Sequence, residues 1–275
     1  MQRLPLILMV AMALDTSMVA RARAAQDPSP ASPLHAKSRQ EIADYESNIS
    51  LRGGAGQEQA ATAFAQKYPK SELRENLLAH ALEAYQRENN PAGILRTGNL
   101  VLAVNPKHSL ALVLTAMVMA DALGPSDPDR EKKIDEIKKN TAQAIQTITT
   151  SFVAPAGATA EQTAVYKTTL EGMAYSALGL TNLKTGDYAD AEKNLRAAAD
   201  LVKVRPDPYI WYHLALAQDH RRKYSAALNS VEQALQLASA YPDLQKLAET
   251  EHLRLMRLAG RTRESIDSGG SQPPQ

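Results

Sequence analysis

The chain has 275 residues, with 31 Lys and Arg against 30 Asp and Glu, so no large net charge would draw it to nucleic acid or to an anionic membrane surface. It contains no cysteine, which excludes disulfides, thiolate metal ligands, a cysteine nucleophile and an acylated cysteine anchor. Ala, Leu, Glu, Lys and Gln recur while Phe occurs twice and Trp once, a composition that favours helices.

The first 24 residues have the features of an export signal. Arg3 provides a positive start, residues 6–14 form a short apolar run, and Ala22 and Ala24 give the small-x-small pattern that a signal peptidase cleaves. We therefore expect a signal peptide over residues 1–24, cleavage near Ala24, and a periplasmic or secreted mature protein. The alternative is an apolar N-terminal helix that stays attached.

No further segment is predicted to span a membrane, and the two ends of the mature chain lack the composition of a packed core. The apolar stretch at 110–123 is shorter than the roughly 20 residues that span a bilayer and contains Asp121, so no transmembrane helix is expected in the mature chain. Residues 25–56 begin with the run QDPSPASP and are predicted to be mostly flexible. The similar composition of residues 261–275 predicts a disordered tail.

Degenerate helical repeat patterns are predicted over residues 57–150. Residues 58–67 look like the second helix of a half-repeat, and a fuller unit begins near Glu75. Another unit begins at Ser109, with its turn expanded to the Gly- and Pro-containing residues 124–128. Residues 151–171 then predict a connector followed by the start of a long helix.

Two later stretches repeat each other with a constant offset of 36 residues. The matched pairs are Tyr175 and Trp211, Leu178 and Leu214, Gly179 and Ala215, Tyr188 and Tyr224, Ala191 and Ala227, Leu195 and Val231, and Ala198 and Ala234. Positions four apart on a helix share one face, and a small residue such as Gly179 or Ala215 lets a second helix approach closely. The spacing predicts two helical hairpins over residues 172–241, followed by a capping helix over 242–260.

These residues resemble the tetratricopeptide repeat (TPR), a helix-turn-helix unit of about 34 residues with the pattern W-x-x-L-G-x-x-Y, then A-x-x-x-F, then P. Asn182 and Gln218 stand where the family usually has Tyr, and the prolines are displaced to Pro206 and Pro242. The resemblance implies an all-α fold in which stacked TPR-like repeats form a right-handed superhelix, an α-solenoid. The alternative is an irregular helical bundle.

No residue pattern predicts catalysis, a metal site or a cofactor. The six histidines include no pair spaced to bind a metal on one helix face, and adjacent helical residues such as Asp219 and His220 point apart. The run LRGGAG at 51–56 lacks the Lys and the Ser or Thr of a phosphate loop and is interpreted as a flexible connector. We expect no enzyme; an enzyme whose site is assembled from scattered residues is the alternative.

The resemblance implies a protein-binding groove along the first helix of each repeat. At the contact positions of the family, the chain carries mostly apolar side chains, and the predicted groove comprises Leu110, Val113, Met117, Met173, Leu180, Tyr209, Tyr212 and Leu216. The Lys and Asn that hold a terminal carboxylate in some members are missing, so the expected ligand is an apolar helical or extended segment. Packing against neighbouring helices, or occupation by the chain's own N-terminal segment, is the alternative.

The function expected from these features is a non-catalytic scaffold or adaptor in the bacterial cell envelope or periplasm, with a protein or peptide as its partner. The phrase AFAQKYPKSEL at 63–73 is similar to repeats of bacterial envelope-assembly proteins. A structural subunit of an envelope-assembly complex is therefore a second possibility.

Overall fold

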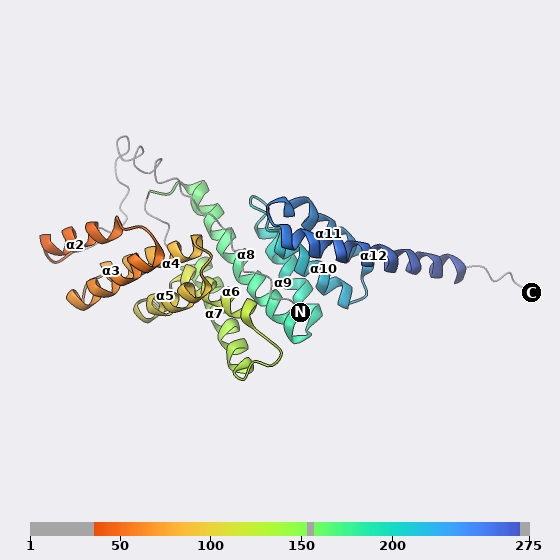
Figure 1. The fold of residues 1–275 in the computed structure, drawn as a ribbon, viewed down its shortest axis with the longest axis horizontal. Helices are drawn as coiled ribbons and strands as arrows, with labels where there is room; N and C mark the ends of the chain where they lie inside the picture. Colours follow the sequence, from red (N-terminus) through yellow and green to blue (C-terminus); the bar gives the residue numbers. More distant parts are fainter. Residues whose placement is uncertain (1–35, 153–156, 270–275) are drawn as a thin grey trace, which may run out of the picture. The chain divides into compact units, whose positions relative to one another are not determined.

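The computed structural model describes residues 36–152 and 157–269, and side chains as far as residue 260. Within these ranges the chain is entirely helical, with eleven α-helices, one short 3-10 helix and no β-strand (Figure 1). The predicted all-α class is confirmed. The predicted signal peptide and the last six residues lie outside the described residues.

The helices follow one another with short connections. They are α2 (Arg39–Ile49), α3 (Gly54–Lys67), α4 (Leu73–Arg87), α5 (Pro91–Val104), α6 (Ser109–Ala122), α7 (Arg130–Thr150), α8 (Ala160–Thr185), α9 (Tyr188–Leu201), α10 (Pro208–His220), α11 (Tyr224–Leu237), η1 (Ala238–Ala240) and α12 (Pro242–Gly269). None of these helices has both the length and the apolar composition needed to cross a bilayer.

The chain divides into two compact units. The N-terminal unit holds the described residues up to Met119 together with residues 139–170, and the C-terminal unit holds residues 120–138 and those from Glu171 onward. The boundaries fall inside α6, α7 and α8.

In the N-terminal unit, consecutive helices pack together, α2 on α3, α3 on α4 and α4 on α5. Glycines allow the close approach. The ring of Tyr85 lies between Gly54 and Gly93, and a Cβ added at either glycine would lie 2.4 or 2.3 Å from a ring carbon. Gly98, which replaces the large residue that the repeat pattern favours, lies against Thr115, where a Cβ would be 2.5 Å from the Cγ2 methyl. Each of these glycines makes room for a neighbouring side chain.

The C-terminal unit continues the same type of packing. Gly172 lies against Val202, and Gly179 against Leu195, so α8 and α9 meet along a seam of glycines. Helix α10 packs on α9 and on α11, and α11 packs on α12. Ala215 at the centre of α10 is fully buried, which allows the same close approach between α10 and α11.

Three helix boundaries differ from the predicted ones. Helix α2 lies inside the segment 25–56 that was predicted to be mostly flexible, and it begins where the Ser38 hydroxyl accepts a hydrogen bond from the backbone N–H of Glu41. Helix α3 already begins at Gly54, within the predicted connector. Helix α12 continues to Gly269, nine residues past the predicted end, because residues 261–269 contain no proline and include helix-favouring Arg and Glu.

Candidate functional site

The eight side chains predicted to line a groove fall into both units. Leu110, Val113 and Met117 belong to the N-terminal unit, and the other five belong to the C-terminal unit. Five of the eight are buried, namely Leu110, Val113, Met117, Met173 and Tyr212, and Leu180, Tyr209 and Leu216 are partly exposed. The buried five therefore have little surface exposed in the folded chain, and the predicted groove stays a prediction.

Helices α11 and α12 together bury this side of α10. Tyr212 belongs to a buried cluster that includes Val231 of α11 and Leu244 and Leu255 of α12, and Leu216 packs against the same cluster. On the same side, Asp219 forms an ion pair with Arg254 of α12 at 2.5 Å. In the C-terminal unit, this face of α10 therefore serves the attachment of the last helix.

The ring of Tyr209 lies beside Tyr241 with the centroids 5.7 Å apart in an edge-to-face arrangement. Burial raises the pKa of the Tyr209 hydroxyl to about 12, and this hydroxyl oxygen is buried without a hydrogen-bond partner among the described residues. Tyr209 therefore works as a packing residue on the side of α10 nearest to η1.

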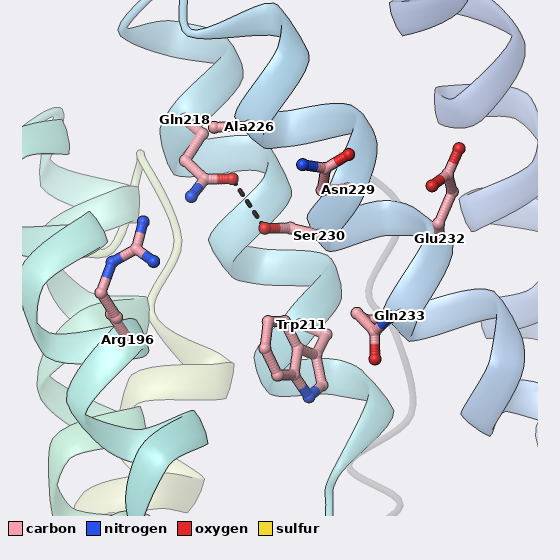
Figure 2. Close-up of a pocket in the computed structure, with 8 residues that line it drawn as sticks. All are labelled: Arg196, Trp211, Gln218, Ala226, Asn229, Ser230, Glu232 and Gln233. Carbon is pink, nitrogen blue, oxygen red and sulfur yellow. Dashed lines mark hydrogen bonds between the residues drawn. The ribbon is translucent and has the colours of Figure 1, made fainter.

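A hollow of about 420 Å³ opens on a different side of α10, between α9 and α11 (Figure 2). Its lining consists of Arg196 from α9, Trp211 and Gln218 from α10, and Ala226, Asn229, Ser230, Glu232 and Gln233 from α11. At about 100° per residue, the direction of Trp211 and Gln218 lies about 130° around α10 from that of Tyr212 and Leu216. The hollow is therefore separate from the predicted groove.

A buried amide forms the floor of the hollow. Gln218 is 1% exposed and Ser230 is 4% exposed. The Ser230 hydroxyl donates a hydrogen bond to the Gln218 carbonyl oxygen Oε1 at 2.7 Å, as Figure 2 shows. This bond fixes the orientation of the Gln218 side chain and leaves both N–H groups of its Nε2 without an acceptor in the described part of the chain.

Three further neutral groups at the hollow are free to bind a ligand. The indole N–H of Trp211 and the side-chain amides of Asn229 and Gln233 have no hydrogen-bond partner within the described ranges. Trp211 itself is partly buried, and its ring packs against the buried clusters on both sides of α10. The hollow thus combines an anchored aromatic ring with neutral donors and acceptors, the combination typical of a binding site.

The charged groups at the rim are already paired. Arg196 donates to the buried carboxylate of Glu192 at 3.2 Å, and the same carboxylate accepts hydrogen bonds from Arg221 and Lys223. Burial alone would raise the pKa of Glu192, but the hydrogen bonds from these cations outweigh it and hold the pKa below the usual 4.5. On the opposite rim, Glu232 lies 3.3 Å from His252. One carboxylate therefore serves three cations, and His252 balances the charge of Glu232 only when it is protonated, so the rim charges have partners but are only partly compensated.

Two other titratable groups in the C-terminal unit have shifted pKa values. Burial raises the pKa of Asp207 to about 6, although the backbone N–H of Tyr209 donates to its carboxylate at 2.8 Å. Burial, with a smaller contribution from Lys184, lowers the pKa of His213 to about 4. Neither side chain is hydrogen-bonded to a second titratable side chain in the described residues, and no group of three His, Asp or Glu there is arranged for a metal ion. These two residues form no acid–base pair.

Sequence reasoning missed the hollow because its lining comes from three helices. Asn229 and Gln233 are ordinary exposed amides when α11 is considered alone. One signal was available, since Gln218 stands where the repeat pattern usually has Tyr. A residue shorter than Tyr at this buried position leaves space on the floor of the hollow.

No family model, no curated protein and no solved structure matches this chain significantly.

Proposed function

We propose that the chain is a TPR-like repeat protein, exported to the periplasm or secreted, that binds a polypeptide partner and performs no catalysis itself. Its helices would stack as repeated hairpins in a solenoid, and the partner would bind a surface formed by successive hairpins. The protein would act as an adaptor or scaffold in the cell envelope.

Support for the repeat architecture comes from the positions of the small residues. The sequence match pairs Gly179 with Ala215 and Leu195 with Val231. Gly179 contacts Leu195 between α8 and α9, and Ala215 shares a buried cluster with Val231 between α10 and α11. The two hairpins therefore use the same pair of positions for the same close approach.

The observation that carries the binding function is the hollow beside Trp211. Trp is enriched at the centres of protein interfaces because it offers a large apolar surface and one N–H donor. Here the ring is held by packing on two sides, and the amides of Asn229 and Gln233 in the same lining have no hydrogen-bond partner in the described chain. A rigid aromatic anchor with unused hydrogen-bonding groups is suited to binding and lacks the perturbed acid–base pair that catalysis needs.

Photo-crosslinking of the full chain in the organism that produces it tests this function. A benzoylphenylalanine would replace Ala226 in the hollow, the exposed Gln59 of α3, or the exposed Lys246 of α12, each in a separate strain. The account predicts a defined polypeptide adduct at one or more of these positions, absent from an unrelated exported protein that carries the same photo-reactive residue. Finding only lipid or glycan adducts at every position would contradict it, and adducts only to a second copy would favour the structural subunit.

A further inference from the structure

We propose that the hollow between α9 and α11 binds an extended polypeptide segment, whose backbone pairs with the amides of Asn229 and Gln233 and whose apolar side chain lies on Trp211. This inference rests on the proposed protein-binding function and names the ligand chemistry of one site.

The unused groups of the hollow match a peptide backbone in chemical type. A side-chain amide offers one carbonyl acceptor and two N–H donors, and each peptide unit offers one acceptor and one donor. At the rim, Arg196 contacts Glu192 and Glu232 contacts His252. Between them, the free groups of Asn229 and Gln233 are neutral amides, which match the neutral groups of a peptide backbone.

The spacing of the two amides on α11 favours an extended chain. Asn229 and Gln233 are four residues apart, which corresponds to about 6 Å along a helix axis. In an extended chain, backbone groups that point to the same side recur every second residue, about 6.7 Å apart. A polyproline helix repeats only every third residue, about 9.3 Å apart, and matches the two amides less well.

Gln218 adds a donor at a fixed position on the floor. Its side chain is 1% exposed, and the hydrogen bond from Ser230 to its oxygen directs the amide nitrogen away from Ser230. The amide nitrogen is not among the buried side-chain atoms that lack a hydrogen-bond partner, so it keeps contact with solvent in the hollow, where a ligand carbonyl can take the place of water. A donor held in a fixed orientation on the floor of the hollow is suited to a ligand acceptor.

The apolar residues that line the hollow favour an apolar side chain in the ligand. Trp211 provides the large apolar surface of the lining, and in the view of Figure 2 it lies at one end of the labelled side chains, with the small side chain of Ala226 towards the other end. An aliphatic or aromatic ligand side chain would remove the exposed part of the ring from water. A segment of alternating apolar and polar uncharged residues would place one apolar side chain on Trp211 and direct its neighbours towards solvent.

The test uses the indole signal of the full chain, which contains a single tryptophan. The probes are a library of capped octapeptides without charged residues, the same peptides with alternate backbone nitrogens methylated, and a tetrasaccharide of N-acetylglucosamine. The expected result is that library peptides bind and shift the Trp211 indole ¹⁵N–¹H resonance saturably. Methylation should weaken binding because it removes backbone donors.

Paired variants separate the hollow from the rest of the surface. Asn229→Ala combined with Gln233→Ala should weaken peptide binding by about tenfold or more, since at least two hydrogen bonds are lost. Gln59→Ala combined with Gln66→Ala removes two exposed amides from α3 and should leave the affinity unchanged. All four residues are exposed, so circular dichroism should show the same helix content in both double variants.

Several results would overturn the inference. Peptides that bind without moving the Trp211 signal, or with the same affinity in the Asn229 and Gln233 double variant, would place the ligand elsewhere and leave the proposed function standing. A Trp211 shift with the tetrasaccharide but with no peptide would make the hollow a glycan site. If no library peptide binds, the inference fails, and the crosslinking result decides the proposed function separately.

Discussion

Leu195 of α9 lies so close to Gly179 of α8 that a Cβ added to the glycine would be 2.5 Å from the Leu195 Cγ and 3.1 Å from its backbone nitrogen. The absent side chain at Gly179 therefore sets the distance between the two helices. The flexible end of Leu195 could move aside, but the backbone of α9 could move only together with the packing around it.

Gly179→Ala should therefore reduce the free energy of unfolding, by about 1–3 kcal/mol. Urea unfolding followed by circular dichroism measures the change. Gly260→Ala is the matched control, because Gly260 lies within α12 and no atom would be within 4 Å of the added Cβ. There the higher helix propensity of Ala should stabilise the chain by about 0.5–1 kcal/mol. Equal effects at the two glycines would refute the proposed seam.

Glu192→Gln should destabilise the C-terminal unit by about 1–3 kcal/mol, since a buried carboxylate that binds three cations loses its charge. The partners are partly exposed, which moderates the loss. Asp200→Asn, in the exposed ion pair with Lys203, should change the free energy of unfolding by less than about 0.5 kcal/mol.

The pKa of Glu192 is lowered on folding, so its stabilisation is present above its unfolded pKa near 4.5 and is lost as the pH falls through the lower folded value. Acid unfolding of Glu192→Gln should therefore show a smaller loss of stability below pH 4.5 than the wild type. An identical acid profile would contradict the role of the Glu192 carboxylate.

Asp207 and His213 should give opposite pH dependences. His213 has a pKa of about 4 in the folded chain, so its contribution to the free energy of unfolding is complete above pH 6.5 and is lost as the pH falls towards 4. Asp207 has a pKa of about 6 in the folded chain, so its contribution to the free energy of unfolding is complete below pH 3.8 and is lost as the pH rises towards 6. Each shift corresponds to about 3 kcal/mol, and the two largely cancel in the wild type.

Single variants should show each of these two pH dependences of stability separately. Asp207→Asn, which keeps a side-chain oxygen to cap α10, should leave a chain whose stability falls as the pH is lowered from 6.5 to 4. His213→Gln should leave a chain whose stability falls as the pH is raised from 4 to 6. Free energies of unfolding measured across this pH range provide the test, and parallel profiles for the two variants would show that the shifts are absent.

Tyr212→Ala should lower the free energy of unfolding by about 3–5 kcal/mol, because Tyr212 packs within the cluster that attaches α12. Tyr212→Phe keeps the ring and should cost less than about 1.5 kcal/mol. Hydrogen exchange should show α12 opening more often in the alanine variant. A full loss of partner binding with unchanged stability would instead support the groove predicted from the sequence.

Gln218→Tyr introduces the residue that the repeat pattern favours and should fill the floor of the hollow. Peptide binding should fall at least tenfold, because the larger side chain occupies the space of the ligand. The free energy of unfolding should change by less than about 3 kcal/mol, the usual upper cost of adding volume to a packed site. Retained peptide affinity in this variant would show that the ligand does not enter the hollow.

The helical class and the hairpins over residues 172–241 could be predicted because their determinants are local. Residues four apart on α8 and α10 share a face whatever the rest of the chain does, and a small residue such as Gly179 or Ala215 marks a close contact. Helix α2 was missed because its sequence is polar, and its beginning depends on the single cap Ser38. Composition alone could not reveal that start.

The candidate site could not be predicted in the same way. The burial of Tyr212 depends on where α12 packs, and the convergence of Gln218, Asn229 and Gln233 depends on the angle between α10 and α11. Neither quantity is encoded in the spacing within one helix. The ligand-contact positions taken from the repeat pattern therefore lie on the side of α10 that packs against α12. The hollow lies about 130° around the same helix.

Intermolecular nuclear Overhauser effects between the full chain and its tightest library peptide test the central claim most directly. Contacts from the Trp211 indole N–H and from the Asn229 and Gln233 side-chain amides to peptide backbone protons at alternate residues are predicted. Contacts confined to Leu180, Tyr209 and Leu216, with none to Trp211, would place the ligand in the groove predicted from the sequence and contradict the account.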